Sequence, residues 1–218
     1  MKGYVIFYVG LHKYSIISVT SEDTYLSVQS PSTGLYKEKG SRFLAFLFPV
    51  ISAEQAKTEI ERIKKEYHDA RHHCFGYRIG LKGDIWRIND DGEPSSTAGK
   101  PIFGQILSNS LSDILIVVVR YFGGIKLGVP GLINAYRSAA ADAIANSTII
   151  TKTATVSIRI DFGYPSMNDV MKLIKESGAG ITNQQFDLQC SICVNVRLRD
   201  EKDFISAVKK ISDCVLKF

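Results

Sequence analysis

The chain has 218 residues, of which 45% are hydrophobic and 22% are charged, and its formal net charge is +5. This composition is that of an ordinary globular protein with one large domain or two small ones, whose core needs no metal or disulfide. Four cysteines exclude a disulfide scaffold, and the lack of roughly 18 continuous apolar residues excludes a membrane span, so we expect a cytoplasmic protein.

The first 20 residues are apolar enough to resemble a signal peptide. However, Gly10, His12 and Lys13 interrupt the apolar core, and no small-residue cleavage site follows. We therefore expect residues 1–20 to be a short N-terminal extension with little bearing on function.

Residues 23–67 combine strand and helix signals. The run 23–28 is typical of a strand, a turn is predicted at 31–34, and residues 42–48 are predicted as an apolar strand. Ser52 is expected to be a helix N-cap with Gln55 at the capping-box position. Apolar residues then recur every three or four positions, which predicts an amphipathic helix lying on a sheet: Ala53, Ala56, Ile60, Ile63 and Tyr67.

The next part of the chain contains a strongly apolar strand and a helix of small residues. A strand is expected at 74–81 and a short helix at 104–111. Residues 113–120 are a continuous apolar run, which predicts a central strand buried on both faces. The alanine-rich residues 131–146 predict a helix whose backbone lies close to the sheet.

From about residue 150 the pattern changes, and we place a domain boundary there. The remaining elements follow the order β-α-β-β-α-β, which is typical of the ferredoxin-like plan. These six elements are expected at residues 154–162, 165–177, 181–188, 190–198, 200–212 and 215–218.

A loop rich in charge, glycine and proline, the acidic loop, occupies residues 89–101. The carboxylates of Asp90, Asp91 and Glu93 could hold Mg²⁺ through oxygen ligands or supply a general base, with Ser95 beside them. The simpler interpretation is structural, with turns made by Asp, Gly and Pro and a helix cap made by Ser or Thr. The loop is not a P-loop, because the required glycine spacing and the Ser or Thr after Lys100 are missing.

A second loop, the glycine segment at residues 120–137, follows the buried strand and leads into a helix. Its glycines allow close backbone approach, and amides at a helix N-terminus attract anions, so it is a candidate contact for phosphate or a nucleic-acid backbone. Helix-on-sheet packing is the alternative use of these glycines. Tyr121, Phe122 and Tyr136 could stack on bases or belong to the core. The candidate anion-binding residues are Arg42, Arg120, Gly123, Gly124, Lys126, Gly128 and Arg137.

The cysteines and histidines supply no convincing nucleophile or metal site. His72 and Cys74 share one side of their strand and His73 the other, and residues two apart rarely make a competent nucleophilic pair. Cys190 and Cys193 have zinc-knuckle spacing without a second pair, and in a strand their thiols face apart. We expect no cofactor.

Four motifs in order resemble the IMPACT/YigZ family. They are residues 39–45 (KGSRFLA), 70–77 (ARHHCFGY), 90–95 (DDGEPS) and 120–128 (RYFGGIKLG). The resemblance implies an α+β protein with an N-terminal domain of ribosomal protein S5 domain 2-like fold at residues 21–150. It also implies a C-terminal ferredoxin-like domain at residues 151–218, similar to the last domain of translation elongation factor G.

The resemblance also implies a function. Eukaryotic members act in translational control by binding the ribosome-associated activator of a starvation-sensing kinase, and bacterial members have been suggested to bind nucleic acid. Some members carry a proline-dipeptidase label, but the metallopeptidase ligand set is missing here. This chain departs from the family pattern at Ser96, commonly glycine, at Val129-Pro130-Gly131, usually richer in glycine, and at Asn134, commonly an arginine suited to phosphate.

We therefore expect a non-enzymatic binding protein of translation or the stress response, whose partner is RNA or a ribosome-associated protein. Its mild excess of positive charge permits an acidic partner. One alternative is a metal-assisted enzyme on a small phosphorylated or nucleotide substrate, with Asp90, Asp91 and Glu93 around the metal. The other alternative is a pure protein-interaction module.

Overall fold

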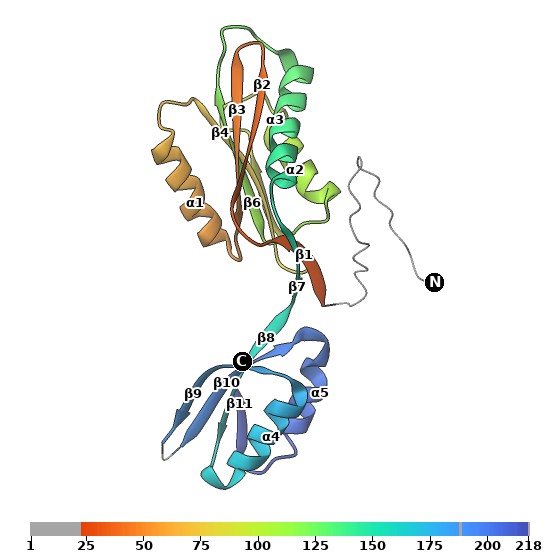
Figure 1. The fold of residues 1–218 in the computed structure, drawn as a ribbon. Coiled ribbons are helices and arrows are strands. Elements are labelled where there is room, and N and C mark those ends of the chain that lie inside the picture. Colours follow the sequence, from red (N-terminus) through yellow and green to blue (C-terminus); the bar gives the residue numbers. More distant parts are fainter. Residues whose placement is uncertain (1–22, 188, 218) are drawn as a thin grey trace, which may run out of the picture. The chain divides into compact units, whose positions relative to one another are not determined.

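The computed structural model describes residues 23–187 and 189–217, which divide into two compact units (Figure 1). The N-terminal unit is Tyr25–Lys152, and the C-terminal unit is residues 153–217 together with residues 23–24. Both units combine strands and helices, so the fold is α+β as predicted. The extension predicted over residues 1–20 lies outside the described residues.

The N-terminal unit is built on a five-stranded antiparallel sheet with helices on both faces (Figure 1). Helix α1 (Ala53–Glu66) covers one face, and α2 (Gly99–Ser108) and α3 (Gly128–Ala145) cover the other. A separate two-stranded sheet pairs β1 (Thr24–Val28) with β7 (Ile149–Thr153). Across the large sheet the strand order is β2 (Ser32–Glu38), β3 (Ser41–Pro49), β6 (Ile114–Tyr121), β4 (His72–Ile79) and β5 (Ile85–Asn89).

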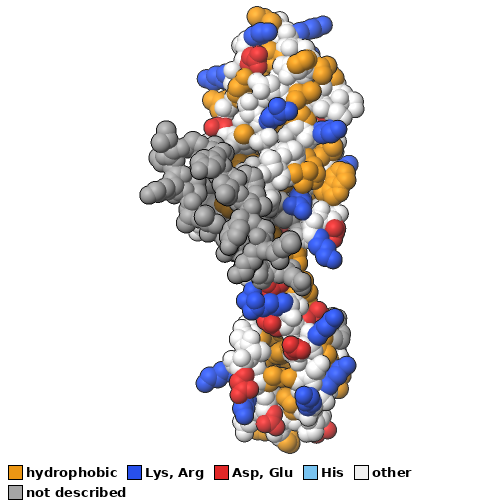
Figure 2. Space-filling model, turned by 90° about the vertical axis from the view of Figure 1, so that its right-hand side faces the viewer, with side chains coloured by type: hydrophobic (Ala, Val, Ile, Leu, Met, Phe, Trp, Pro, Cys, Tyr) orange, Lys and Arg blue, Asp and Glu red, His pale blue; other side chains and the backbone are white. Residues whose placement is uncertain are grey.

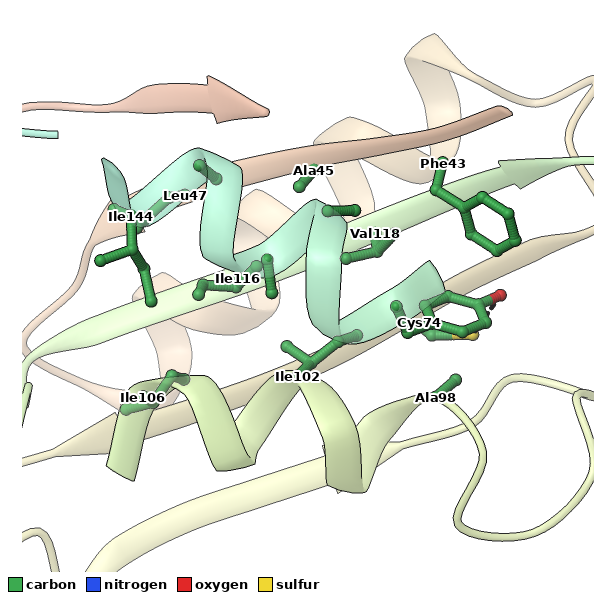
Figure 3. Close-up of a cluster of buried hydrophobic side chains, with 14 of the residues drawn as sticks. Phe43, Ala45, Leu47, Cys74, Ala98, Ile102, Ile106, Ile116, Val118 and Ile144 are labelled. Atoms are coloured by element: carbon green, nitrogen blue, oxygen red, sulfur yellow. Dashed lines mark hydrogen bonds between the residues drawn. The ribbon is translucent and has the colours of Figure 1, made fainter. Parts of the chain in front are cut away.

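Strand β6 lies at the centre of this sheet and confirms the predicted strand buried on both faces. Residues 114–120 are all buried. Because neighbouring side chains of a strand point to opposite faces, the even-numbered ones join Ile102 of α2 in one core and the odd-numbered ones join Ile63 of α1 in the other. Figure 3 shows Ile116 and Val118 of β6 in the first core, between the strands and the two helices.

Helix α1 begins with the predicted capping residues. The Ser52 hydroxyl accepts a hydrogen bond from the Gln55 N–H at 3.2 Å, and the Gln55 side chain accepts one from the Ile51 N–H at 2.9 Å. These bonds satisfy amide groups at the helix start that have no partner within the helix. Burial of Ile60 and Ile63 confirms the predicted amphipathic face.

Helix α3 lies very close to the sheet, as its alanine-rich sequence predicts. A Cβ atom on Gly34 of β2 would be 2.3 Å from the backbone nitrogen of Ala143, a separation that atoms cannot adopt. Two residues earlier, the Ser32 hydroxyl donates to the Ala143 carbonyl at 2.7 Å. Glycine at position 34 is therefore required where the strand and helix backbones approach.

Several predicted boundaries are wrong. The turn predicted at 31–34 is the start of β2, which pairs with β3 from Ser32 onward. The helix predicted at 104–111 begins earlier, at Gly99, and ends at Ser108. Strands β5 and β7 were not predicted, because five residues between turn signals carry too short an alternating pattern.

The C-terminal unit has the predicted β-α-β-β-α-β order in a four-stranded antiparallel sheet (Figure 1). Its elements are β8 (Thr155–Phe162), α4 (Met167–Ser177), β9 (Gly180–Phe186), β10 (Cys190–Arg197), α5 (Glu201–Val208) and β11 (Cys214–Lys217). The sheet order is β11-β8-β10-β9, and the buried sides of α4 and α5 share one core with it. Within residues 23–187 and 189–217, every helix is too short or too polar to span a bilayer.

Candidate functional site

The acidic loop and the glycine segment meet at a cluster of buried polar side chains. The Arg120 guanidinium donates to a Glu93 carboxylate oxygen at 2.6 Å, and the Tyr136 hydroxyl donates to the same oxygen at 2.8 Å. The Cys74 thiol lies 3.3 Å from the Tyr136 hydroxyl and 3.0 Å from the Asp90 carbonyl oxygen. We call Cys74, Glu93, Arg120 and Tyr136 the Glu93 cluster.

Each member of the Glu93 cluster comes from a different element. Arg120 is near the end of β6, opposite His72 of the adjacent strand β4, and Cys74 lies two residues further along β4. Tyr136 lies on the buried side of α3. Glu93 follows β5 in the acidic loop, so the cluster joins the loops that follow β5 and β6, the two strands that flank β4.

Burial keeps the thiol and the phenol of this cluster in their neutral forms. Burial raises the pKa of the Cys74 thiol well above its ordinary value, and nearby carboxylates add to this effect although the Tyr136 hydroxyl opposes it. Burial, with Cys74 and Glu93 as neighbours, also raises the pKa of Tyr136. Because a reactive cysteine acts as its thiolate, Cys74 is unsuited to nucleophilic catalysis.

The two histidines beside Cys74 have structural partners of their own. A ring nitrogen of His72 lies 2.8 Å from the Asp91 carbonyl oxygen, and a ring nitrogen of His73 lies 3.0 Å from the Tyr67 carbonyl oxygen. These contacts hold the acidic loop and the end of α1 against β4. The pattern of adjacent histidine and cysteine is thus accounted for by packing.

Arg120 is buried inside the glycine segment, whereas the sequence pattern suggested a surface contact for anions. Its guanidinium carbon lies 5.5 Å from the ring centre of Phe43 and 5.6 Å from that of Phe122. Its Nε atom is buried and has no hydrogen-bond partner among the described residues. Arg120 therefore supports the segment from within and is separate from its exposed cations.

Asp90 caps helix α2. Its carboxylate accepts hydrogen bonds from the backbone N–H groups of Ser96, Ala98 and Gly99 at 2.8, 3.0 and 2.8 Å. The capping side chain expected from Ser or Thr is thus supplied by Asp90, since the N-cap residue is Ala98 and its side chain makes no cap bond. Ser95, the other residue named in this loop, is exposed.

Asp91 points in a different direction from Asp90 and Glu93. Its carboxylate accepts from the His73 N–H at 2.7 Å and lies 3.2 Å from the Lys64 ammonium group. Burial raises the pKa of Asp91, but the His73 N–H and Lys64 outweigh it, and the pKa lies below its ordinary value. In the part of the chain that the structure describes, no group of three or more His, Cys, Asp or Glu side chains is arranged to hold a metal ion.

The glycines of the second loop allow it to pack against the β2–β3 turn. A Cβ atom on Gly123 would be 1.9 Å from the carbonyl carbon of Gly40, and the Gly123 N–H donates to the Ser41 hydroxyl at 3.1 Å. Gly124 and Gly128 have φ values of 89° and 72°, which other residues rarely adopt. Close packing against the β2–β3 turn and left-handed backbone are thus the structural roles of these glycines; helix-on-sheet packing was the structural role expected from the sequence.

This packing creates a surface that mixes positive charge with apolar side chains. Phe122 and Ile125 are 57% and 56% exposed. Residues 120–137 contain no acidic side chain, and Figure 2 shows Lys and Arg side chains interspersed with hydrophobic ones on the visible face of the N-terminal unit. We define the glycine-loop surface as the exposed residues Lys39, Arg42, Phe122, Gly124, Ile125 and Lys126.

One expected member, Arg137, is placed differently. Arg137 is exposed on α3, but it follows Gly128 by nine residues, which corresponds to about 14 Å along a helix. Asn134 donates its side-chain amide to the Tyr36 hydroxyl at 3.2 Å. Lys39 and Ile125 were not predicted as members of this surface. The Lys39-Gly40 turn beside Ser41 is the sequence signal that could have identified Lys39.

Comparison with known proteins gives consistent matches. The family model described as the Impact N-terminal domain matches residues 39–144. IMPACT family member YigZ of Escherichia coli (strain K12) is 33% identical over 178 residues, 81% of this chain and 86% of that protein. IMPACT family member YvyE of Bacillus subtilis (strain 168) is 36% identical over 137 residues, 63% of each chain.

More distant relatives and a solved structure extend the comparison. Protein IMPACT of Xenopus laevis is 34% identical over 96 residues, and this chain spans 30% of its length. The crystal structure of a hypothetical protein is 29% identical with a TM-score of 0.70, and the match covers 89% of this chain and 96% of that one.

Proposed function

Because the chain belongs to the IMPACT family, we propose that it is a non-enzymatic, cytoplasmic binding protein of translational control or the stress response. Its partner in this proposal is RNA or a ribosome-associated assembly, bound through the glycine-loop surface. The proposal takes residues 21–150 as a ribosomal protein S5 domain 2-like domain and residues 151–218 as a ferredoxin-like domain. Both are folds of translation proteins, which supports the proposal only by analogy.

One observation carries the proposal: charge is separated between the two loops. Asp90, Asp91 and Glu93 are turned toward backbone amides, Lys64 and Arg120. The cations of the glycine-loop surface stay exposed, and residues 120–137, which include Lys126, contain no acidic residue; Glu38 precedes Lys39 on the adjacent hairpin. A surface of this kind attracts anions. The carboxylates of the acidic loop are engaged by groups of the protein itself, which argues against a metal-assisted reaction.

The side chains beside these cations favour single-stranded RNA over a simple phosphate ion. Phe122 exposes an aromatic ring and precedes Lys126 by four residues, and the backbone between them includes two glycines. Proteins that bind single strands combine positive charge along the backbone with rings on which bases stack. Lys39 and Arg42 extend the positive charge onto the adjacent β-hairpin.

The proposal is tested by the salt dependence of RNA binding. Fluorescence anisotropy of a labelled single-stranded RNA would be measured over a range of salt concentrations for the wild type and for Lys126→Gln. Loss of one phosphate contact should weaken binding and lower the slope of log K against log salt by about 0.7. Lys65→Gln, which removes an exposed charge at the end of α1, serves as the matched control and should bind like the wild type.

The same variants separate RNA from a protein partner. If Lys126→Gln leaves both the affinity and the slope unchanged, RNA binding at this surface is wrong. Capture of ribosomal particles that survives nuclease treatment but is lost in Lys126→Gln would assign the surface to a protein instead.

A further inference from the structure

Strand β5 forms a free edge of the N-terminal sheet. Among the described strands its only neighbour is β4, and an edge strand presents unpaired N–H and C=O groups to its surroundings. At one end this edge is covered, because a Cβ atom on Gly99 of α2 would be 2.8 Å from the Asn89 backbone nitrogen. The accessible edge is therefore residues 85–88, which we call the β5 edge.

The β5 edge carries exposed apolar side chains. Ile85 and Trp86 are 54% and 56% exposed, and the Trp86 ring lies 5.4 Å from the Phe103 ring of α2. Leu107, one helical turn further along α2, is also exposed. Tryptophan is enriched among the residues that contribute most to binding at protein interfaces, and this is the only tryptophan of the chain.

Charge determines which occupant suits this edge. Arg87 lies within it, and Lys82 and Lys100 are exposed beside its two ends. The acidic residues beside the edge are the exposed Asp84 and the half-buried Asp90, and the Asp90 carboxylate is engaged in capping α2. A second copy of the chain that paired β5 with β5 about Arg87 would place like charges opposite each other, which destabilises a strand pair. An acidic strand would instead place opposite charges together.

We propose that the β5 edge binds an extended acidic peptide segment of a partner protein by strand addition. Backbone hydrogen bonds to β5 provide the pairing, and Trp86 with Phe103 receives an apolar side chain of the segment. The carboxylates of the segment lie beside Arg87. None of these residues belongs to the glycine-loop surface, so the failure of either proposal leaves the other intact.

The proposal can be tested with Trp86 as the reporter. A short blocked peptide of alternating valine and glutamate would be titrated into the full chain while tryptophan emission is recorded. We expect a saturable shift of emission for the wild type and about tenfold weaker binding for Arg87→Glu, because opposite charges across strands are replaced by like charges. Arg87→Gln should lie between them. Lys210→Glu, the same charge reversal in the C-terminal unit, should bind like the wild type.

Two further measurements test the pairing and the choice of occupant. Hydrogen exchange should show slower exchange, when the peptide is bound, of those amides of residues 85–88 that do not already pair with β4. A peptide of alternating valine and lysine should fail to bind. The proposal is overturned if the lysine peptide binds equally well, if no amide of the β5 edge gains protection, or if sedimentation shows that a second copy occupies the edge.

Discussion

Arg120 and Glu93 form an ion pair whose side chains are only 9% and 3% exposed, and this pair joins the glycine segment to the acidic loop. A charge removed from water is tolerated when its counter-charge is in contact with it. The pair therefore holds two loops of opposite charge together and leaves the remaining cations of the glycine segment on the surface.

Removing one partner of this pair should be strongly destabilising. We expect Glu93→Gln to lower the free energy of unfolding by about 3 kcal/mol, because Arg120 would remain charged and buried without a counter-charge. Arg120→Met should have a similar effect, and the double variant should lose less than the sum of the two. Urea unfolding followed by Trp86 fluorescence reports on this unit, and additive losses would show that the pair is not coupled.

Ser96 occupies a backbone conformation suited to glycine. Its φ is 64°, and its N–H still donates to Asp90, a bond that glycine retains. We expect Ser96→Gly to stabilise the protein by about 1 kcal/mol, since left-handed backbone costs other residues roughly this amount. Ser95→Gly is the matched control and should be neutral or destabilising. Ser95 has no left-handed backbone for glycine to relieve, so the substitution only increases the conformational entropy of the unfolded state. A loss of stability in Ser96→Gly would contradict this explanation.

Asp91 should make stability depend on pH in the acidic range. Its pKa is lower in the folded protein than its ordinary value, so the ionised form stabilises the fold. This contribution is complete above the ordinary pKa of about 4 and is lost as the pH falls through the folded-state pKa. We expect Asp91→Asn to be less stable than the wild type by about 1 kcal/mol at neutral pH.

The difference between wild type and Asp91→Asn should shrink as the pH is lowered below about 4. Asparagine is the appropriate replacement because it tolerates the φ of 41° at this position as aspartate does. Urea unfolding at several pH values measures the effect, and a difference that is constant with pH would rule out the ionised carboxylate as its source.

The approach of β2 to α3 gives a fourth prediction. Gly34→Ala should lower the free energy of unfolding by at least about 2 kcal/mol, because the added methyl group overlaps the α3 backbone. Gly104→Ala has open space around the new methyl group and lies inside α2, so it should stabilise by up to about 1 kcal/mol. Thermal unfolding of both variants is the measurement, and equal behaviour of the two would refute close packing at position 34.

The parts of the fold that were predicted correctly depend on local patterns. The apolar run of β6 and the spacing of apolar residues in α1 repeat over many positions, so each is recognisable without knowledge of its neighbours. The β-α-β-β-α-β order of the C-terminal unit was predictable for the same reason. Strand β5 was missed because its half-exposed side chains carry no such pattern.

The candidate site was harder to predict because its contacts join distant residues. Glu93 and Arg120 are 27 residues apart, and nothing in either loop alone indicates that this cation is buried while Lys126 is exposed. Asp90 caps amides that lie six to nine residues later in the chain. Rules for helix caps instead predict a Ser or Thr side chain directly before the helix. Only the packed sheet and helices decide which charges remain at the surface.

The most direct test of the glycine-loop surface is to map the bound RNA by ultraviolet cross-linking and mass spectrometry of the cross-linked peptides. We expect cross-links at Phe122 and in the peptides that contain Lys39 and Lys126, and their loss at high salt. Cross-links confined to the C-terminal unit or to the acidic loop, or equal yield at all salt concentrations, would contradict the proposed function.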